Sequence, residues 1–476
     1  MARINTNVSS LTAQRGLAKS QRLLGDTLQR LSSGLKINRG ADDPAGLIAS
    51  EGLRSEIAGL DQAIDNSSRA SNVISTAEAN LGEIASLLTN VKQLVVEAAN
   101  SGALSQDEIA ANQLQIDSAV ASITRISNTA TFAGLKLLNG SLDYITSGVA
   151  TSAITALHVH QANFGTTPTM PVQIDVLTSA NTAALQFQAS SIASSITLEI
   201  SGNEGVDVLT FTSGTAASAI AYAINRITDS TGVSVDLINS AAPTSGIVFR
   251  STGYGSKSFV SVRVQSGTFA TVNSANTAAT RAVGVDAVAT INGALTVADG
   301  LNLKMNTTTL DLELSLDSAF GTGQTDFTIT GGGAKFQLGP QVTSNQQVSL
   351  GIQSAAASKL GDSDVGFLSD IVTGGNASLA NGGASDASKI IERSIRQVAV
   401  LRGRLGAFER NTLDTNMNSL SVALENVTAS ESTIRDADFA VETSNLTRAQ
   451  ILTQAGTSVL ATANSTPQSV LLLLQR

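Results

Sequence analysis

The chain contains no cysteine and no tryptophan, and only 3% of its 476 residues are aromatic. Without cysteine, neither disulfide bonds nor thiolate chemistry are available. No stretch approaches the ~18 consecutive apolar residues that a membrane-spanning helix needs, so we expect no membrane insertion. Met1–Asn7 is polar and lacks the apolar core of a secretory signal. Export would therefore use a route that needs no cleaved signal peptide.

Positive charge is also scarce, since the formal net charge is −9. Nucleic-acid binding requires clustered cations to contact phosphates, so the acidic balance argues against it. One local exception exists. Residues 1–40 carry seven lysines and arginines against a single acid, Asp26. Such an excess fits either a solvated helix face or a role in assembly or export.

The two ends of the chain are alike, and the middle differs from both. Residues 1–139 and 384–476 each contain one proline and are rich in Ala, Leu, Ser, Gln and Asn, a composition typical of long helices. Residues 144–333 are rich in Thr, Ser, Gly and Val and alternate as β-strands do. We therefore predict a multidomain protein in which all-α terminal domains, coiled-coil or helical-bundle in type, carry an inserted β-rich (α+β) central domain.

The N-terminal part predicts three helices. Apolar residues three or four apart from Ile4 to Leu35 form one stripe. Asp43 is a suitable N-cap and Pro44 a suitable first residue for a second helix. Ser105 and Glu108 make a capping box that opens a third helix. The second helix carries a heptad seam, which comprises Ile57, Leu60, Ile64, Ser67, Ser71, Ile74, Ala77, Leu81, Ile84, Leu88, Val91, Val95 and Ala98.

The C-terminal part predicts further amphipathic helices. Ser385 or Asp386 caps a helix with an apolar side that extends to Val427, and a last long stretch covers residues 434–460. Thr466-Pro467 is predicted to start a separate short apolar helix.

A single amphipathic helix cannot bury its own stripe. At ~25 cal/mol per Å², exposing several Leu and Ile side chains costs several kcal/mol. Residues 1–40 and 434–476 therefore need each other or other copies of the chain.

The middle predicts two β-rich units. The first has strands at 198–200, 208–211, 233–237, 247–250 and 259–264, with a helix at 216–228. The second, residues 283–316, has turns at Asn292-Gly293 and Asp299-Gly300. Gly331–Gly333 is interpreted as a flexible joint. A hairpin of 336–338 and 348–352 then leads back to the helices.

Signals for catalysis are scarce. His158 and His160 lie on one face of a possible strand, but no third metal ligand is evident nearby, and surface histidines are expected. The Gly253–Ser258 loop has Ser256 where a phosphate-binding loop requires glycine, so a turn is expected. Asp42-Asp43 is explained by helix capping. No metalloprotease motif occurs, and we predict neither enzymatic activity nor a cofactor.

Several long motifs at both ends, in the correct order, resemble bacterial flagellin. The resemblance covers about 1–140 and 336–476. The matching segments are Ala2–Asn7, Leu31–Asn38, Ala41–Gly46, Ile434–Ala440 and Arg448–Gly456.

The resemblance implies a subunit that polymerises into a flagellar filament of many copies. Residues 1–40 plus 434–476 would form a coiled-coil inner tube, disordered in the monomer. Residues 41–140 plus 334–433 would form a helical core domain with a β-hairpin, and 141–333 the exposed variable region. The unit from Val283 looks like the β-rich insert motif of flagellins. Filament-assembly contacts are expected at Ile4, Leu11, Leu28, Leu31, Leu35, Asp43, Pro44, Phe439, Leu452, Leu460 and Leu471.

The resemblance also implies partners and a location. A flagellin is secreted by the type III export route, its C-terminal tail is bound by an export chaperone, and it meets filament cap and junction proteins outside the cell. Some flagellins are sensed by Toll-like receptor 5. Leu94 matches a contact of that surface, but Asn90 stands where an arginine is typical and Gln115 replaces a glutamate. We therefore expect weak recognition.

Two alternatives stay open at this point. The hook–filament junction protein shares the terminal helices, although the flagellin-like C-terminus through Leu474 argues against it. Alternatively, the central region adds an adhesive function to a flagellin.

Overall fold

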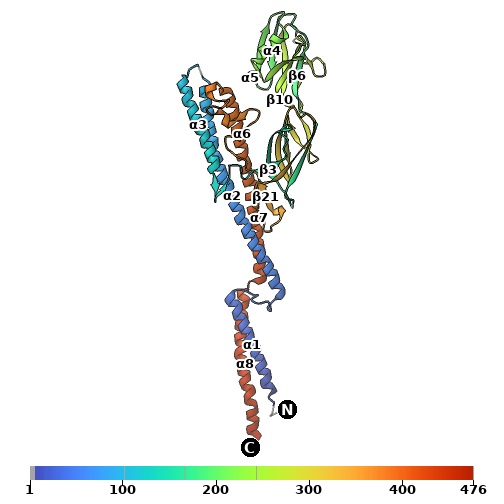
Figure 1. The fold of residues 1–476 in the computed structure, drawn as a ribbon. Coiled ribbons are helices and arrows are strands. Elements are labelled where there is room, and N and C mark those ends of the chain that lie inside the picture. Colours follow the sequence, from blue (N-terminus) through green and yellow to red (C-terminus); the bar gives the residue numbers. More distant parts are fainter. Residues whose placement is uncertain (1–5, 101, 166, 243, 475–476) are drawn as a thin grey trace. The chain divides into compact units, whose positions relative to one another are not determined.

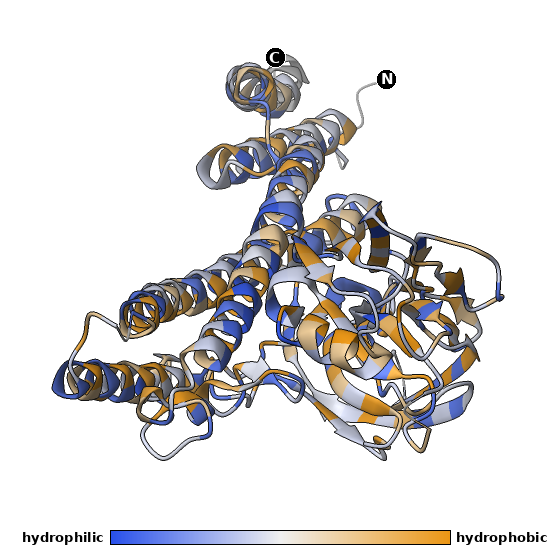
Figure 2. Ribbon diagram, turned by 90° about the horizontal axis from the view of Figure 1, so that it is seen from above, coloured by the Kyte–Doolittle hydropathy of each residue, from blue (hydrophilic) through white to orange (hydrophobic). Residues whose placement is uncertain are grey.

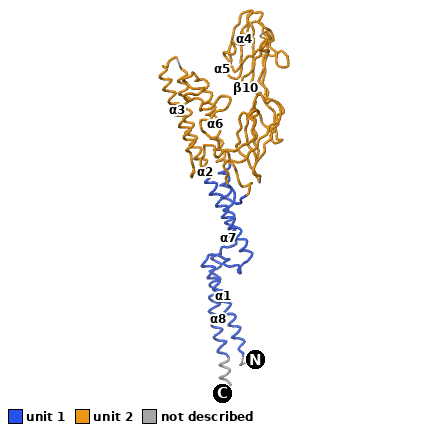
Figure 3. The backbone as a smooth tube through the Cα atoms, in the orientation of Figure 1, with its two compact units in different colours: residues 1–69, 337–342, 412–476 blue, residues 70–336, 343–411 orange. Residues whose placement is uncertain are grey.

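The computed structural model describes residues 6–100, 102–165, 167–242 and 244–474, with the backbone alone for 467–474. The chain divides into two compact units, which Figure 3 distinguishes by colour. The terminal unit consists of Met1–Arg69, Gln337–Val342 and Thr412–Arg476, and the central unit of Ala70–Phe336 and Thr343–Asn411. The predicted fold class, helical ends with an inserted β-rich middle, is confirmed.

Helices make up most of the terminal unit. It contains α1 (Val8–Ser33), the first part of α2 (Pro44–Ala98), α7 (Thr415–Arg435) and α8 (Phe439–Leu474). α1 and α8 lie side by side (Figure 1), and α7 packs on α2 around Leu60, Ala63 and Leu420. Each pair buries apolar surface that a single helix would expose.

The predicted start and seam of α2 are confirmed. Pro44 is its first residue, and the Asp43 carboxylate accepts a hydrogen bond of 2.9 Å from the Gly46 amide. Most of the seam is buried, namely Leu60, Ser67, Ile74, Ala77, Leu81, Ile84, Leu88, Val91, Val95 and Ala98. In Figure 2, hydrophobic and hydrophilic residues alternate along the helices accordingly.

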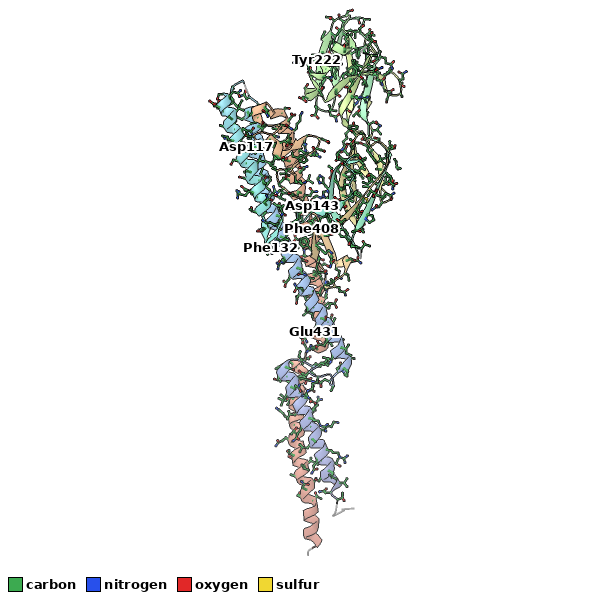
Figure 4. The ribbon with its side chains drawn as sticks, viewed as in Figure 1. Asp117, Phe132, Asp143, Tyr222, Phe408 and Glu431 are labelled. Atoms are coloured by element: carbon green, nitrogen blue, oxygen red, sulfur yellow. The ribbon has the colours of Figure 1, made fainter. Side chains whose placement is uncertain are left out.

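The capping box of the third helix is also confirmed. In α3 (Gln106–Thr129), the Ser105 hydroxyl accepts from the Glu108 amide, and Glu108 accepts from the Ser105 amide. Asp117 of α3, labelled in Figure 4, accepts hydrogen bonds from the amide and hydroxyl of Thr373.

The start of α6 (Ala384–Phe408) differs from the prediction. Gly383 precedes the helix, and neither Ser385 nor Asp386 caps it. A Cβ on Gly383 would lie 2.6 Å from the carbonyl carbon of Ala377, so close packing rather than a capping side chain selects this residue. A π-helical segment, Glu409–Asp414, then separates α6 from α7. The sequence pattern did not predict this segment.

The end of α8 also differs from the prediction, because no new helix starts at Thr466-Pro467. α8 continues through Pro467 to Leu474. Proline lacks the N–H that would bond to the carbonyl four residues earlier, here that of Ala463. The side-chain amide of Asn7 donates to this carbonyl at 2.8 Å. The other helix thus supplies the donor that Pro467 lacks.

Two antiparallel sheets enclose one hydrophobic core nearer the helices, which we call the inner β module. One sheet has the strand order β15-β14-β5-β19-β3 and the other β16-β17-β18-β4. Its strands are β3 (Tyr144–Ser147), β4 (Ile154–Ala162), β5 (Met170–Thr178), β14 (Val288–Ile291), β15 (Ala294–Leu295), β16 (Val297–Asp299), β17 (Asn302–Asn306), β18 (Leu310–Leu316) and β19 (Gly323–Gly332). The turn at Asn292-Gly293 lies where it was predicted, whereas the turn predicted at Asp299-Gly300 is one residue later, at Gly300-Leu301.

The outer β module, inserted between β5 and β14, has a separate core. Its sheets have the orders β12-β6-β10-β9 and β13-β11-β7-β8. Its elements are β6 (Thr182–Phe187), β7 (Ile196–Ser201), β8 (Val206–Phe211), α4 (Ala217–Asn225), α5 (Thr228–Thr231), β9 (Val233–Leu237), β10 (Ile247–Tyr254), β11 (Phe259–Ser266), β12 (Val272–Asn273) and β13 (Arg281–Val283). The five predicted strands are confirmed. The predicted helix ends at Asn225, and Tyr222 on it is exposed (Figure 4).

Short elements complete the chain. The predicted hairpin is confirmed as β20 (Ala334–Gln337) with β21 (Gln347–Leu350). The others are β1 (Thr131–Phe132), β2 (Leu135–Lys136), β22 (Gly361–Asp362), β23 (Gly366–Phe367), and the 3-10 helices η1 (Ser344–Gln346), η2 (Leu368–Ile371) and η3 (Leu379–Asn381).

The interpretation of Gly331–Gly333 as a flexible joint is wrong. Gly331 and Gly332 belong to β19, which pairs with β3. Gly332 and Gly333 have φ of +91° and +78°, and Cβ atoms there would lie within 3 Å of Asp143 and Tyr144, respectively. Gly332 is required by a close approach of two backbone segments, and Gly333 by the Tyr144 ring that lies against it.

Candidate assembly surface

α1 and α8 form an antiparallel pair with one constant register. Asn7 contacts Ala463, the Gly456 Cα lies against Leu17, and Arg30 faces Glu442. The same register extends beyond the two helices, since the Lys36 amide, after the end of α1, donates to the Arg435 carbonyl, before the start of α8, at 2.7 Å. Residues far apart in the sequence therefore hold both ends of the pair together.

Asn7 has two roles at the start of the pair. Its side-chain oxygen accepts from the Ser10 amide at 3.0 Å and so caps α1, while its nitrogen donates to Ala463. The Ser10 hydroxyl donates to the Asn464 side chain at 2.7 Å. One residue thus caps the start of α1 and fixes the position of α8 along it.

The inward faces of the two helices carry small or polar side chains. Ser10, Thr27 and Ala449 are buried there, and a Cβ on Gly456 would lie 3.3 Å from Leu17 Cδ1. Small residues allow close approach of the helix axes, as close packing over a long distance requires. The pair therefore does not depend on large apolar side chains at its centre.

The exposed faces of the two helices differ in charge, although both carry apolar side chains, which on α1 are Val8, Leu11, Leu23 and Leu28. On α8, apolar side chains are exposed, including Val441, Ile451, Leu452 and Val459. On α1, the exposed row Arg15, Lys19 and Arg22 follows the i, i+4, i+7 spacing of one helix face. An apolar face that nothing in the described chain covers marks an interaction site.

The predicted assembly residues take different positions. Leu11, Leu28, Phe439 and Leu452 are exposed, whereas Leu31, Leu35 and Leu460 are half-buried. Asp43 and Pro44 begin α2. Leu471 is in α8, but its side chain lies outside the described residues, as does the whole of Ile4.

Sequence reasoning missed other residues of this surface. Arg30, Glu442 and Gly456 are central to the pair, and Val441 and Val459 extend its apolar face. Gly456 is the last residue of the Arg448–Gly456 motif, and a glycine inside a helical pattern could have indicated close packing at this position. Nothing in the sequence around Glu442 indicated that its side chain is buried.

The turn between α1 and α2 is built from its own polar groups. The Asp42 carboxylate accepts from the amides of Arg39 and Asn38, and these bonds lower the pKa of Asp42. The Ala437 amide donates to the Gly34 carbonyl at 2.9 Å. Capping and turn chemistry therefore account for Asp42 and Asp43.

The predicted receptor-facing residues lie on α2 and α3. Asn90 and Gln115 are exposed, and Leu94 is half-buried.

The two histidines are half-buried in β4, so their interpretation as surface residues is wrong. Their rings stack with centroids 6.5 Å apart. Burial, with help from the charges of Arg404, His158 and Lys304, lowers the pKa of His160 to about 3. No group of three metal-ligating side chains gathers within the described ranges.

The Gly253–Ser258 loop forms a turn around a carboxylate of the same chain. Asp286 Oδ1 accepts from the amides of Ser256 and Gly300, at 2.9 and 2.8 Å, and Oδ2 accepts from the Ser256 hydroxyl. These bonds lower the pKa of Asp286. Gly255 has φ of +94°, and a Cβ there would lie 2.4 Å from Asp286 Oδ1. The Ser256 and Gly300 amides are thus already bonded to Asp286, which lies in the linker between the two β modules.

Among the described residues, none of the helices combines the length and the apolar composition that a membrane-spanning segment needs.

Comparison with known families matches three regions. Residues 4–143 match the bacterial flagellin N-terminal helical region, and residues 388–474 the C-terminal helical region. Residues 197–253 match the flagellin hook IN motif. This motif lies in the outer β module, so its predicted position from Val283 onward is wrong.

Known relatives match over nearly the whole chain. Flagellins of Salmonella rubislaw and Salmonella typhimurium strain LT2 are each 31% identical, and the B-type flagellin of Pseudomonas aeruginosa PAO1 is 30% identical. Each alignment covers 99% of this chain and 99% of the relative. The chain belongs to the bacterial flagellin family, the structural subunits of flagellar filaments.

Proposed function

We propose that the α1–α8 pair is the surface through which this filament subunit polymerises. The observation that carries the proposal is the exposed apolar face of α8, formed by Val441, Ile451, Leu452 and Val459. Covering such side chains contributes ~25 cal/mol per Å² of apolar surface removed from water. In a polymer of many copies, neighbouring subunits provide that cover. The protein is a structural subunit and not an enzyme.

We also propose that the subunit has three parts in the filament. Residues 1–40 with 434–476 form the inner tube, 41–140 with 334–433 the surrounding helical domain, and 141–333 the outward region. The register of α1 on α8 supports the pairing of the two terminal segments.

A matched pair of variants tests the assembly surface. Val459 on α8 is 58% exposed and Val206 in the outer β module is 60% exposed. Val459→Asp should prevent elongation of filament seeds, because assembly would bury an unpaired charge. Val206→Asp should elongate normally. Elongation is monitored by electron microscopy. Equal elongation by both variants would refute the proposal.

Two further variants test the pairing of the termini. Deletion of 434–476 should abolish polymerisation while the β modules stay folded. Leu31→Asp or Leu35→Asp should have the same effect, since both leucines are half-buried. Filaments formed by the truncated chain would disprove the pairing.

The export route and partners are proposed from family membership. The subunit is secreted by the flagellar type III route, with a chaperone on its C-terminal tail, and grows under a cap beyond the junction proteins. In a strain that lacks the cap protein, we expect the secreted subunit not to be retained on filaments. Normal filaments without a cap would contradict it.

Weak sensing by Toll-like receptor 5 is proposed from α2 and α3. Asn90 and Gln115 are exposed and replace the arginine and glutamate typical of that surface. In a cell reporter assay with purified monomer, the double variant Asn90→Arg/Gln115→Glu should signal more strongly than the natural chain. An unchanged or weaker signal would overturn the assignment.

A further inference from the structure

The terminal unit separates its charges along the sequence. Among residues 6–39, the six cations Arg15, Lys19, Arg22, Arg30, Lys36 and Arg39 face one acid, Asp26. Residues 412–438 have the opposite composition, with the five acids Asp414, Glu425, Glu431, Asp436 and Asp438 against one cation, Arg435. Both regions belong to the same compact unit. A segregation of this kind creates two oppositely charged surfaces on one molecule.

The basic surface lies on the outward face of α1. Arg15, Lys19 and Arg22 are exposed and share one helix face over about 10 Å, as the helical rise of 1.5 Å per residue requires. Residues on the opposite side of α1, such as Leu17, contact α8 instead. None of the three cations makes an ion pair with the described part of its own chain.

The acidic surface lies on the outward face of α7 and includes Asp414, the residue that precedes this helix. Asp414 and Glu425 are exposed and eleven residues apart, a spacing that returns to almost the same helix face after about three turns. Side chains of the other face, such as Leu420 and Leu424, pack against α2. The single arginine, Arg435, pairs with Glu51 at 3.1 Å and with Glu431 at 3.9 Å, so Glu431 is paired within the chain and does not belong to the acidic face. Within the described residues, Asp414 and Glu425 make no ion pair.

We propose that the Arg15–Lys19–Arg22 row of one subunit docks against the Asp414–Glu425 face of a second copy in the filament. The occupant is a copy of this chain because filament growth uses heterologous contacts, in which two different surfaces of identical subunits meet. The opposite charges of the two faces favour this contact between two copies. The exposed apolar side chains of Val8 and Leu11 lie on the same face of α1 as the basic row and extend the proposed contact surface. The inference rests on the polymerisation proposed above.

The charged side chains of both faces are exposed, and this exposure limits how much their contact can stabilise the filament. Exposed ion pairs contribute little to equilibrium stability, but complementary surfaces accelerate encounter and select its orientation. The contact should therefore control the rate of elongation more than the final stability of the filament. Salt should weaken it, because the Debye length falls from about 10 Å at 0.1 M to about 3 Å at 1 M.

Charge exchange tests the docking directly. The variant Arg15→Glu/Lys19→Glu/Arg22→Glu and the variant Asp414→Lys/Glu425→Lys should each elongate seeds of their own kind about tenfold more slowly than the natural chain at 50 mM salt. A chain with both sets of changes should recover to within about threefold. The control Arg226→Glu reverses an exposed arginine of the outer β module and should elongate normally.

The outcomes separate this inference from the proposed function. If the chain with both sets elongates as slowly as the triple variant, the two faces do not meet. If either reversal alone leaves the low-salt rate unchanged, the inference is also wrong. Failure of the natural chain to elongate seeds would instead refute the polymerisation proposal itself. Circular dichroism of each variant verifies that a slow rate does not reflect unfolding.

Discussion

The Arg30 guanidinium lies 3.4 Å from the Glu442 carboxylate, and this ion pair joins α1 to α8. Glu442 is only 6% exposed, and its Oε2 atom accepts no hydrogen bond within the described part of the chain. A buried carboxylate with one partner depends strongly on that partner.

Replacing Arg30 should therefore weaken polymerisation. Arg30→Met leaves the Glu442 charge unpaired, and we expect a loss of about 1–3 kcal/mol in the helix pairing, less than for a fully buried pair because Arg30 is partly exposed. The critical concentration for seeded growth should rise about tenfold or more. The double variant Arg30→Met/Glu442→Met should restore most of the loss, since no charge is left buried. A single variant equal to the natural chain would show that the pair contributes nothing.

Asn7 offers a substitution that separates its two roles. Asn7→Asp keeps the acceptor that caps α1 but loses the donor to the Ala463 carbonyl. We expect α1 to keep its start, while α8 loses about 1–2 kcal/mol around Pro467. Hydrogen exchange in filaments should show faster exchange at residues 464–466 alone. Equal exchange in both proteins would mean that Asn7 does not replace the missing helical donor.

Two glycines of the helix pair should respond in opposite directions. Gly456→Val should separate α8 from α1, because even a Cβ there would lie 3.3 Å from Leu17 Cδ1. Gly16→Ala should stabilise α1 by about 0.5–1 kcal/mol, since its Cβ would meet nothing within 4 Å. Critical concentrations should rise for the first variant and fall for the second. The same direction of change in both would contradict the observed packing.

The stacked histidines predict a loss of stability in mild acid. An unfolded histidine has a pKa near 6.5, whereas that of His160 is lowered to about 3 by burial and by nearby Arg404. As the pH falls from 6.5 towards 3, the unfolded chain takes up a proton that the folded chain refuses, so the stability present above pH 6.5 is lost. The total should be of the order of 5 kcal/mol if the whole range is titrated.

Neighbouring charges determine the variant used for this test. Glu313 opposes His158 across the sheet, and Arg393 and Arg404 reach the pair from α6. Burial lowers the pKa of His158 as well, so His160→Gln removes one of two titrating groups and should reduce the slope of the urea-unfolding free energy between pH 6.5 and 4.5. Carboxyl groups with a lowered pKa, such as Asp286, act below that window. An unchanged slope in the variant would exclude His160 as the cause.

The Asp286 turn predicts a specific effect on the outer β module. Gly255→Ala would place a Cβ 2.4 Å from Asp286 Oδ1 and should disrupt the bonds between the loop and the linker. Lys257, now paired with Asp299, should become cleavable by trypsin about tenfold faster or more. Gly214→Ala is the control, because its φ is also positive but no atom lies within 4 Å. Equal cleavage of both variants would show that backbone strain alone is responsible.

Local patterns explain most of the fold that the sequence predicted. The seam of α2 and the Ser105–Glu108 capping box depend on residues three or four apart, and both are confirmed. Turns such as Asn292-Gly293 depend on two adjacent residues and are likewise confirmed.

The wrong predictions share a different cause, which is contact between distant segments. Pro467 continues α8 because Asn7, far away in the sequence, donates to Ala463. His160 is half-buried because β4 lies in a packed sheet, and Gly383 precedes α6 because Ala377 lies against it. The importance of Arg30 likewise depends on its distant partner Glu442, so it could not be read from neighbouring residues.

The β modules are nested, and each is entered and left through strands that pair with one another. Tyr144, the first residue of β3, opposes Gly332, the last of β19, and Thr178 of β5 opposes Val288 of β14. Each insertion therefore begins and ends at almost one point, so the surrounding structure closes without it. In evolutionary terms, a whole module can be exchanged, shortened or lost by recombination at these two junctions while the helices that build the filament keep their register.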